Sequence, residues 1–242
     1  MTDATTSRVR LPLPAIWREW GRFVRRPSLP PQREALEWPA VRDVAWLLVL
    51  NIAISVALLA LLVPLSQALA IETPEFEALT QRGWLFTLAT GALAVPLMEE
   101  LVARGWLAGR RRHLALAGVL IGAVLAIVAG RFAEIGGWPT TAIAASFAGL
   151  AVMVARRVPD EVPPWFARHF PALFYASAAV FSLAHLSNYD LSRPLVLIPF
   201  VIPQFVAALL FGFARVKFGM WANIALHSLS NALFLTLTLS GI

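Results

Sequence analysis

Apolar residues dominate the chain in seven long stretches that are separated by short polar connections. The stretches cover approximately residues 44–68, 84–108, 114–130, 138–155, 171–188, 194–214 and 220–240. An α-helix needs about 20 apolar residues to cross the hydrocarbon layer of a membrane, and each stretch has that length or nearly so. The sequence therefore predicts an all-α fold, a polytopic transmembrane helix bundle of about seven spans.

The segment before the first span is polar and rich in arginine. Five of its apolar residues follow helical spacing: Ile16, Trp17, Trp20, Phe23 and Val24. Arginine and glutamate fill the opposite face, a pattern typical of an amphipathic helix on a membrane surface. The alternative is a solvated basic arm that only sets the topology. We therefore expect an interfacial, cytoplasmic arm over residues 1–42 and a transmembrane domain over residues 43–242.

Composition supports a membrane protein and excludes several kinds of site. Hydrophobic residues make up 59% of the chain, mean hydropathy is +0.71 and only 14% of residues are charged, against about 25% in soluble domains. The chain has no cysteine, which excludes disulfides, thiolate metal sites and a cysteine nucleophile. In a membrane protein, an excess of basic residues such as the net charge of +6 reflects which segments lie inside. We therefore do not interpret it as a sign of nucleic-acid binding and expect no nucleic-acid partner.

The distribution of basic residues predicts the orientation. With the N-terminus inside, 16 basic residues fall on inner segments and three, Arg82, Arg131 and Arg193, on outer loops. Inner loops of membrane proteins carry such an excess of arginine and lysine. We expect a multi-pass protein of a bacterial cytoplasmic membrane, with its N-terminus in the cytoplasm and its C-terminus outside.

Ionisable residues within the second span are the first candidates for function, because charges inside a membrane are costly. Glu100 and Arg104 are four residues apart, so they share a helix face and can form an ion pair. Glu99 has no such partner in its own span and suits a general base. Pro96 should leave backbone carbonyls nearby in need of partners. The alternative is that all three charges only hold the bundle together.

Two later spans carry histidines. Phe181 and His185 are four residues apart, with Asn188 a turn later, and His227 and Asn231 are again four apart. Counted along ideal helices, Glu99 and His227 lie at a similar depth of about 15 Å from the inner boundary, whereas His185 lies at about 25 Å. His185 reaches the others only if its span starts late or tilts. Packing histidines without chemistry are the alternative for both spans.

Together these residues resemble the CPBP family, which comprises CAAX proteases and bacteriocin-processing enzymes and is also called Abi. Its motifs correspond here to Glu99-Glu100-Leu-Val-Ala-Arg104, Phe181-Ser-Leu-Ala-His185 and His227-Ser-Leu-Ser-Asn231. Each motif has only two or three fixed residues, but all three occur in order on apolar spans. The resemblance covers about residues 90–112 and 168–240.

The spacing of the first two motifs departs from this family. Its members usually carry them on consecutive helices, whereas 86 positions separate Glu99 from His185 here. The intervening residues 114–165 hold two predicted spans, which return the chain to the same side of the membrane. We interpret them as an inserted helical hairpin.

The resemblance implies an intramembrane protease of the type II CAAX prenyl kind. Glu99 and His185 would activate a water, His227 and Asn231 would stabilise the oxyanion, and Glu100, Arg104, Phe181 and Asn188 would support the site. We expect no cofactor. The alternative is a zinc site formed by Glu99, His185 and His227 with a water, since one carboxylate and two histidines form a known catalytic zinc set.

Functions of other classes remain open from the residues alone. An inactive relative could bind a membrane partner, as in immunity, although every polar motif residue is retained. A proton-coupled transporter would also bury glutamate and histidine, but such folds usually contain internal repeats, and none is apparent. The expected partners are the lipid bilayer and a membrane-associated peptide or protein.

Overall fold

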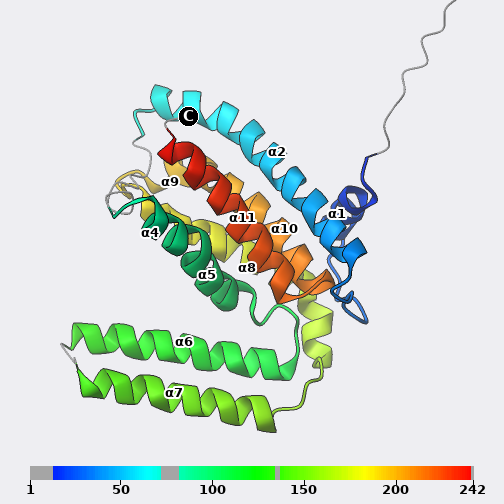
Figure 1. Cartoon of the computed structure of the whole chain (residues 1–242), viewed down its shortest axis with the longest axis vertical. Helices are drawn as coiled ribbons and strands as arrows, with labels where there is room; N and C mark the ends of the chain where they lie inside the picture. The colour runs from blue at the N-terminus through cyan, green and yellow to red at the C-terminus, as the bar shows by residue number, and fades with distance from the viewer. Residues whose placement is uncertain (1–12, 72–81, 134–136, 241–242) are drawn as a thin grey trace, which may run out of the picture.

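The protein is a bundle of helices, described here by a computed structural model over residues 13–71, 82–133 and 137–240. In those ranges all regular structure is helical, and seven helices are long and apolar enough to cross a membrane. The chain is therefore an integral membrane protein, and the predicted all-α, seven-span fold is confirmed (Figure 1).

The helices follow the predicted order, with several spans broken into shorter pieces. The first half contains α1 (Ala15–Arg25), α2 (Trp38–Ala68), α4 (Trp84–Leu88), the π-helical segment η1 (Ala89–Ala94), α5 (Val95–Arg104), α6 (Arg111–Phe132) and α7 (Trp138–Arg157). The second half contains α8 (Pro164–Ala184), the 3₁₀ turn η2 (His185–Asn188), α9 (Pro194–Leu197), the 3₁₀ turn η3 (Ile198–Val201), α10 (Ile202–Lys217) and α11 (Met220–Leu239).

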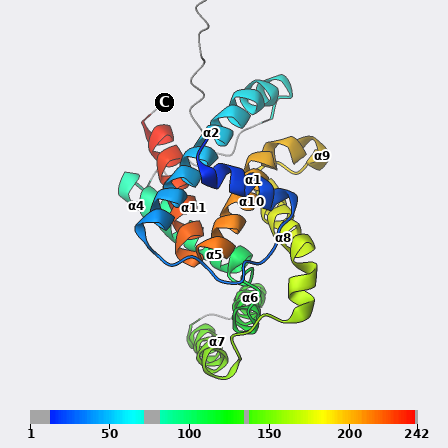
Figure 2. The ribbon, with the colours of Figure 1, turned by 90° about the vertical axis from the view of Figure 1, so that its right-hand side faces the viewer.

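Helix α10 lies at the centre of the bundle. One buried cluster joins it to α1, α2 and α11 through residues such as Leu47, Leu210 and Leu226. A second cluster joins it to α5 and α8 and includes Phe170 and Phe174. Gly212 permits this close packing, because a Cβ there would lie 2.8 Å from the Phe174 ring. The central position of α10 fixes α5, α8 and α11 around one interior (Figure 2).

The amphipathic helix that the sequence predicts in the arm exists as α1, but protein covers much of its apolar face. Ile16 is buried against α2 and α10. The Trp17 Nε1–H donates to the carbonyl oxygen of Trp46 at 2.7 Å, and the Phe23 ring lies 5.0 Å from that of Phe213. An apolar helix face matches a helix bundle as well as it matches lipid, so the sequence pattern alone does not identify the covering surface.

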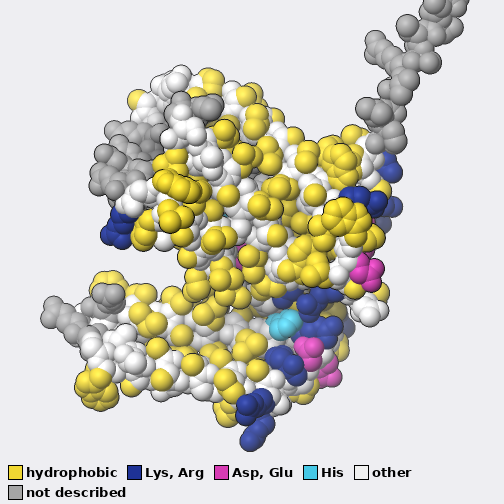
Figure 3. Space-filling view, viewed as in Figure 1, with side chains coloured by type: hydrophobic (Ala, Val, Ile, Leu, Met, Phe, Trp, Pro, Cys, Tyr) yellow, Lys and Arg dark blue, Asp and Glu magenta, His cyan; other side chains and the backbone are white. Residues whose placement is uncertain are grey.

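Helices α6 and α7, which hold the two spans predicted within residues 114–165, form an antiparallel hairpin beside the bundle (Figures 1 and 2). Helix α7 has no buried residue and packs mainly against α6, where the Phe147 ring approaches Gly122. The two ends of the hairpin meet, because the Arg111 N–H donates to the carbonyl oxygen of Glu161 at 2.8 Å. In the space-filling view a hollow separates part of the hairpin from the bundle (Figure 3).

Candidate active site

The second span bends through a π-helical segment directly before its acidic residues. Pro96 has no N–H, and the Val95 N–H donates to the carbonyl oxygen of Thr90, so the span itself supplies no regular partner for the carbonyl oxygen of Gly91. The Asn231 side chain on α11 donates its Nδ2–H to that oxygen at 3.0 Å. The sequence predicted free carbonyls near Pro96, and Asn231 is the partner of one of them.

Glu100 is fully buried and is the centre of a polar network between α5 and α11. It accepts hydrogen bonds from Arg104, from Asn223 Nδ2 at 2.5 Å and from His227 Nδ1 at 2.8 Å. The ion pair with Arg104 follows the four-residue spacing predicted from sequence. A carboxylate is tolerated inside the bundle here because a cation and two neutral donors surround it.

Aromatic rings enclose the cation of this network. The guanidinium carbon of Arg104 lies 4.3 Å from the ring centroid of Phe181 on α8 and 5.6 Å from that of Phe211 on α10. Phe211 also stacks on the His227 ring at 5.1 Å. These contacts hold both the cation and the imidazole in fixed orientations without adding polar partners.

The second acidic residue, Glu99, faces the other nitrogen of the same histidine. Its Oε2 lies 3.6 Å from His227 Nε2, and about a third of its side chain is exposed. A carboxylate can only accept, so His227 donates its Nδ1–H to Glu100, and Nε2 is the nitrogen that faces Glu99. The partly exposed Glu99 and the buried His227 thus form a pair, and Glu100 contacts the opposite nitrogen of the ring.

His185 lies at the end of α8, where the helix tightens into η2. It donates Nδ1–H to the carbonyl oxygen of Phe181 at 2.8 Å, and its Nε2 has no hydrogen-bond partner among the described residues. The Phe181 ring contacts both histidines, with centroid distances of 4.7 Å to His185 and 6.0 Å to His227. Among the described side chains His185 has no hydrogen bond or ion pair with Glu99. Asn188 is exposed at the end of η2.

The zinc alternative requires three ligands to converge. Within residues 13–71, 82–133 and 137–240, no three His, Cys, Asp or Glu side chains form a group that could hold a metal ion. Glu99, His185 and His227 therefore do not fit a zinc site as they lie, and we derive no step through a metal.

Two residues of this region were not singled out from sequence. Asn223 precedes His227 by four residues and Asn231 by eight, so this polar stripe along α11 was visible as a spacing. Arg215 was counted only as an inner basic residue. It is in fact buried, and it donates from Nε to the carbonyl oxygen of Arg104 and from Nη2 to that of Gly105. It thereby holds the C-terminal end of α5 against α10.

Residues 81–233, more than half of the 242-residue chain, match the protein-family model described as Type II CAAX prenyl endopeptidase Rce1-like. The match includes all three motifs and the α6–α7 hairpin. No curated protein and no solved structure matches the chain.

Proposed function

Since this chain belongs to the Type II CAAX prenyl endopeptidase Rce1-like family, we propose that it is an intramembrane endopeptidase acting on a membrane-associated protein or peptide. One observation carries the proposal. Glu99 and His227 Nε2 lie 3.6 Å apart on different helices, with Glu100 bound to the opposite nitrogen of the same ring. Two acceptors at this separation can both contact one water at about 2.8 Å.

We assign Glu99 as the general base. It takes one proton from the water while the water oxygen bonds to the peptide carbonyl carbon. The C–N bond then breaks, and Glu99 returns the proton to the leaving nitrogen. His227 orients the water, because its Nε2 accepts a hydrogen bond from the second O–H of the water. In this proposal the His227 ring is neutral. Its role differs from the oxyanion contact expected for His227 from sequence, because such a ring, bound through Nδ1, has no second N–H to donate.

The remaining roles follow from groups that keep a free donor or acceptor. Asn231 uses one amide hydrogen for Gly91 and keeps a second for the oxyanion of the tetrahedral intermediate. His185 has no hydrogen-bond partner at Nε2 among the described side chains, but Glu99 and His227 already take both hydrogens of the water, so we assign His185 no hydrogen bond to it. Glu100 and Arg104 position His227. The assay below compares substrates with and without a prenyl group.

The test is proteolysis by purified protein in liposomes that contain membrane proteins of its host, with new peptide ends identified by mass spectrometry. We expect Glu99→Gln to reduce cleavage by about 10²-fold or more, since general base catalysis contributes 10²–10⁴-fold. Glu37→Gln is the matched control, because Glu37 is exposed and remote in the arm. A chelator added to the same assay is expected to leave cleavage unchanged.

Three results would contradict the proposal in different ways. Equal cleavage by Glu99→Gln and wild type would remove Glu99 from the chemistry. Loss of activity in chelator that zinc restores would replace the metal-free mechanism. If folded wild-type protein produces no new peptide ends, with or without added prenylated CAAX peptide, the chain is a membrane partner protein without protease activity.

A further inference from the structure

A small pocket lies where the N-terminal arm crosses one end of the bundle. Its walls come from four segments distant in sequence: residues 29–33 of the arm, Ala108 and Arg110 after α5, Val162 before α8, and Val216 on α10. The cavity volume is about 50 Å³, which suits a small group such as phosphate. The pocket is separate from the Glu99–His227 pair, whose residues do not line it.

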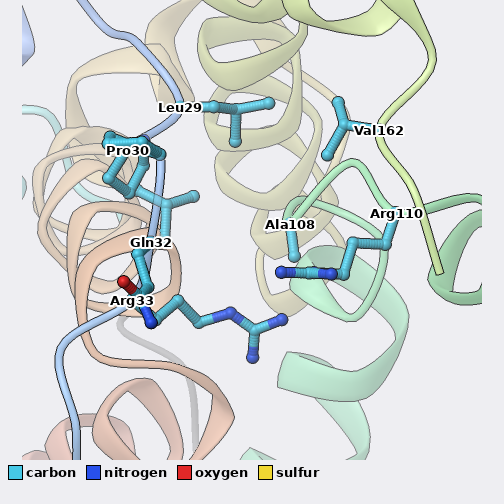
Figure 4. A pocket seen from close by; sticks show the side chains of 9 residues that line it. Leu29, Pro30, Gln32, Arg33, Ala108, Arg110 and Val162 are labelled. Carbon is cyan, nitrogen blue, oxygen red and sulfur yellow. The ribbon is translucent and has the colours of Figure 1, made fainter.

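Two arginines meet in this pocket. Figure 4 shows the side chains of Arg33 and Arg110 extending toward one another from the arm and from the connection after α5. Arg110 Nη1 donates to Asp160, both to its carbonyl oxygen and to Oδ2, at 3.0 Å. In the described part of the chain, Arg33 has neither an ion pair nor a side-chain hydrogen bond. The carboxylate of Asp160 is therefore already engaged by Arg110.

The charge balance around Arg33 is positive. Burial and the nearby charge of Arg110 lower the pKa of Arg33, and Asp160 offsets this only in part. Arg215 and His113 also lie close enough to interact with the charge of Arg33. Both have a buried nitrogen, Arg215 Nη1 and His113 Nδ1, without a hydrogen-bond partner among the described residues. Like charges kept this close favour an anion between them.

The arm is held so that Arg33 stays in place. Pro30 and Pro31 restrict the backbone before it. Directly after it, the Glu34 N–H donates to the carbonyl oxygen of Lys217 at 2.9 Å, and the Glu34 carboxylate pairs with the Lys217 ammonium. A guanidinium fixed by its own backbone loses little freedom when it binds a ligand.

The pocket belongs to a wider basic surface. Arg18, Arg22 and Arg25 line a separate hollow on α1, and most of the lysine and arginine side chains in view gather at the same end of the molecule (Figure 3). Basic pockets beside transmembrane helices bind the head groups of anionic lipids, and arginine binds phosphate oxygens in a bidentate manner.

We propose that Arg33 and Arg110 bind a phosphate group in this pocket. Two sources share this chemistry: the head group of an anionic phospholipid in the leaflet on the side of the arm, and free inorganic phosphate. The site is independent of peptide hydrolysis, so it stands or falls separately from the proposed protease function.

The experiment measures binding to full-length protein in neutral detergent by calorimetry, in three arms. The ligands are short-chain phosphatidylglycerol, short-chain phosphatidylcholine and inorganic phosphate. Saturable binding of phosphatidylglycerol alone identifies a lipid head group, and binding of inorganic phosphate as well identifies a general phosphate site. Either result supports the proposal, whereas no saturable binding of phosphatidylglycerol or phosphate overturns it.

Variants assign the binding to the pocket. Arg33→Gln should weaken it about tenfold, as expected for loss of charge-assisted hydrogen bonds. Arg26→Gln is the control, because it makes the same charge change at an exposed position of the same arm. Asp160→Asn should instead tighten binding, because it removes the negative charge that competes with the phosphate for Arg110, and a gain cannot arise from misfolding. Equal affinities for Arg33→Gln and Arg26→Gln would overturn the assignment, as would an unchanged or weaker affinity for Asp160→Asn.

Discussion

At the scale of single residues, Glu100 organises the buried polar network although it is not the proposed base. Its two oxygens accept from Arg104, Asn223 and His227, and it has no exposed surface. Removing a partner from a buried charge costs more than the hydrogen bond itself contributes, because the charge then remains desolvated. The network therefore couples the stability of the bundle to the tautomer of His227.

Asn223→Ala tests this coupling. The change leaves Glu100 Oε2 without its donor, and we expect a loss of about 1–3 kcal/mol in the free energy of unfolding. Thermal or detergent-induced unfolding of the purified protein measures it. The control is Asn188→Ala, at an exposed asparagine with no side-chain hydrogen bond in the described structure, which should leave stability nearly unchanged. Equal stabilities of the two variants would show that Asn223 does not support Glu100.

Sequence spacing predicted the contacts within one helix better than those between helices. The Glu100–Arg104 pair follows directly from positions four apart. The same rule applied along α11 would have included Asn223. By contrast, the approach of Glu99 to His227, with no direct bond to His185, depends on the starts and tilts of three spans. Residue counts along ideal helices gave the similar depths of Glu99 and His227 but not these contacts.

At the scale of elements, the π-helical segment η1 links helix geometry to the site. Pro96 removes one N–H, the segment takes a wider turn, and Asn231 from α11 satisfies the carbonyl oxygen of Gly91. Such π segments occur often at functional sites. Here the segment ties the helix that carries Glu99 to the helix that carries His227.

The dependence of this link on Pro96 predicts a compensation. Asn231→Ala should cost about 1–3 kcal/mol of unfolding free energy, because the Gly91 carbonyl loses its donor. In a Pro96→Ala background the cost should be smaller, because a backbone N–H at position 96 can take that place. Unfolding of the two single variants and the double variant measures the coupling. Strictly additive losses would show that Asn231 acts elsewhere.

The insertion of the α6–α7 hairpin stays a prediction, and α7 packs mainly against α6. Its ends meet through the Arg111–Glu161 backbone hydrogen bond and ion pair. Replacing residues 113–157 with a short Gly-Ser linker should therefore leave a folded five-span protein. Gel filtration and thermal unfolding after purification measure this. A replacement by an unrelated apolar helical hairpin of the same length is the control for insertion into the membrane.

Failure of the shortened protein alone to fold would show that the hairpin is part of the core. If it folds but no longer cleaves the substrate, the hairpin takes part in substrate access.

The start of α8, directly after the hairpin, could not be predicted from the sequence. Apolar runs gave the two spans, but the extension of α8 back to Pro164, through Arg168 and His169, was hidden by polar residues that continue a helix beyond its apolar part.

At the scale of the whole molecule, apolar runs of membrane length were enough to predict the fold class and the number of spans. Lipid leaves the backbone few choices besides helix, so composition alone is informative. The packing of α1 could not be predicted in the same way, because apolar side chains such as Ile16 and Phe23 can be buried by either lipid or protein. Orientation remains a prediction from the excess of basic residues on inner segments.

The absence of cysteine makes the orientation directly measurable. Single reporters Arg26→Cys in the arm and Asp190→Cys in the loop after η2 lie at exposed positions. With the N-terminus in the cytoplasm, an impermeant thiol reagent should label only Asp190→Cys in intact cells and both in permeabilised cells. Labelling of only Arg26→Cys in intact cells would reverse the topology, and the cysteine-free wild type is the control.

The most direct test of the account is a double-mutant cycle between Glu99 and His227, measured as kcat/KM for cleavage of an identified substrate. If both groups hold one water, Glu99→Gln and His227→Gln should each reduce kcat/KM by about 10²-fold or more, and the double variant should be little worse than the poorer single variant. Effects that multiply in the double variant, or a fully active His227→Gln, would contradict the assignment of this pair to one reacting water.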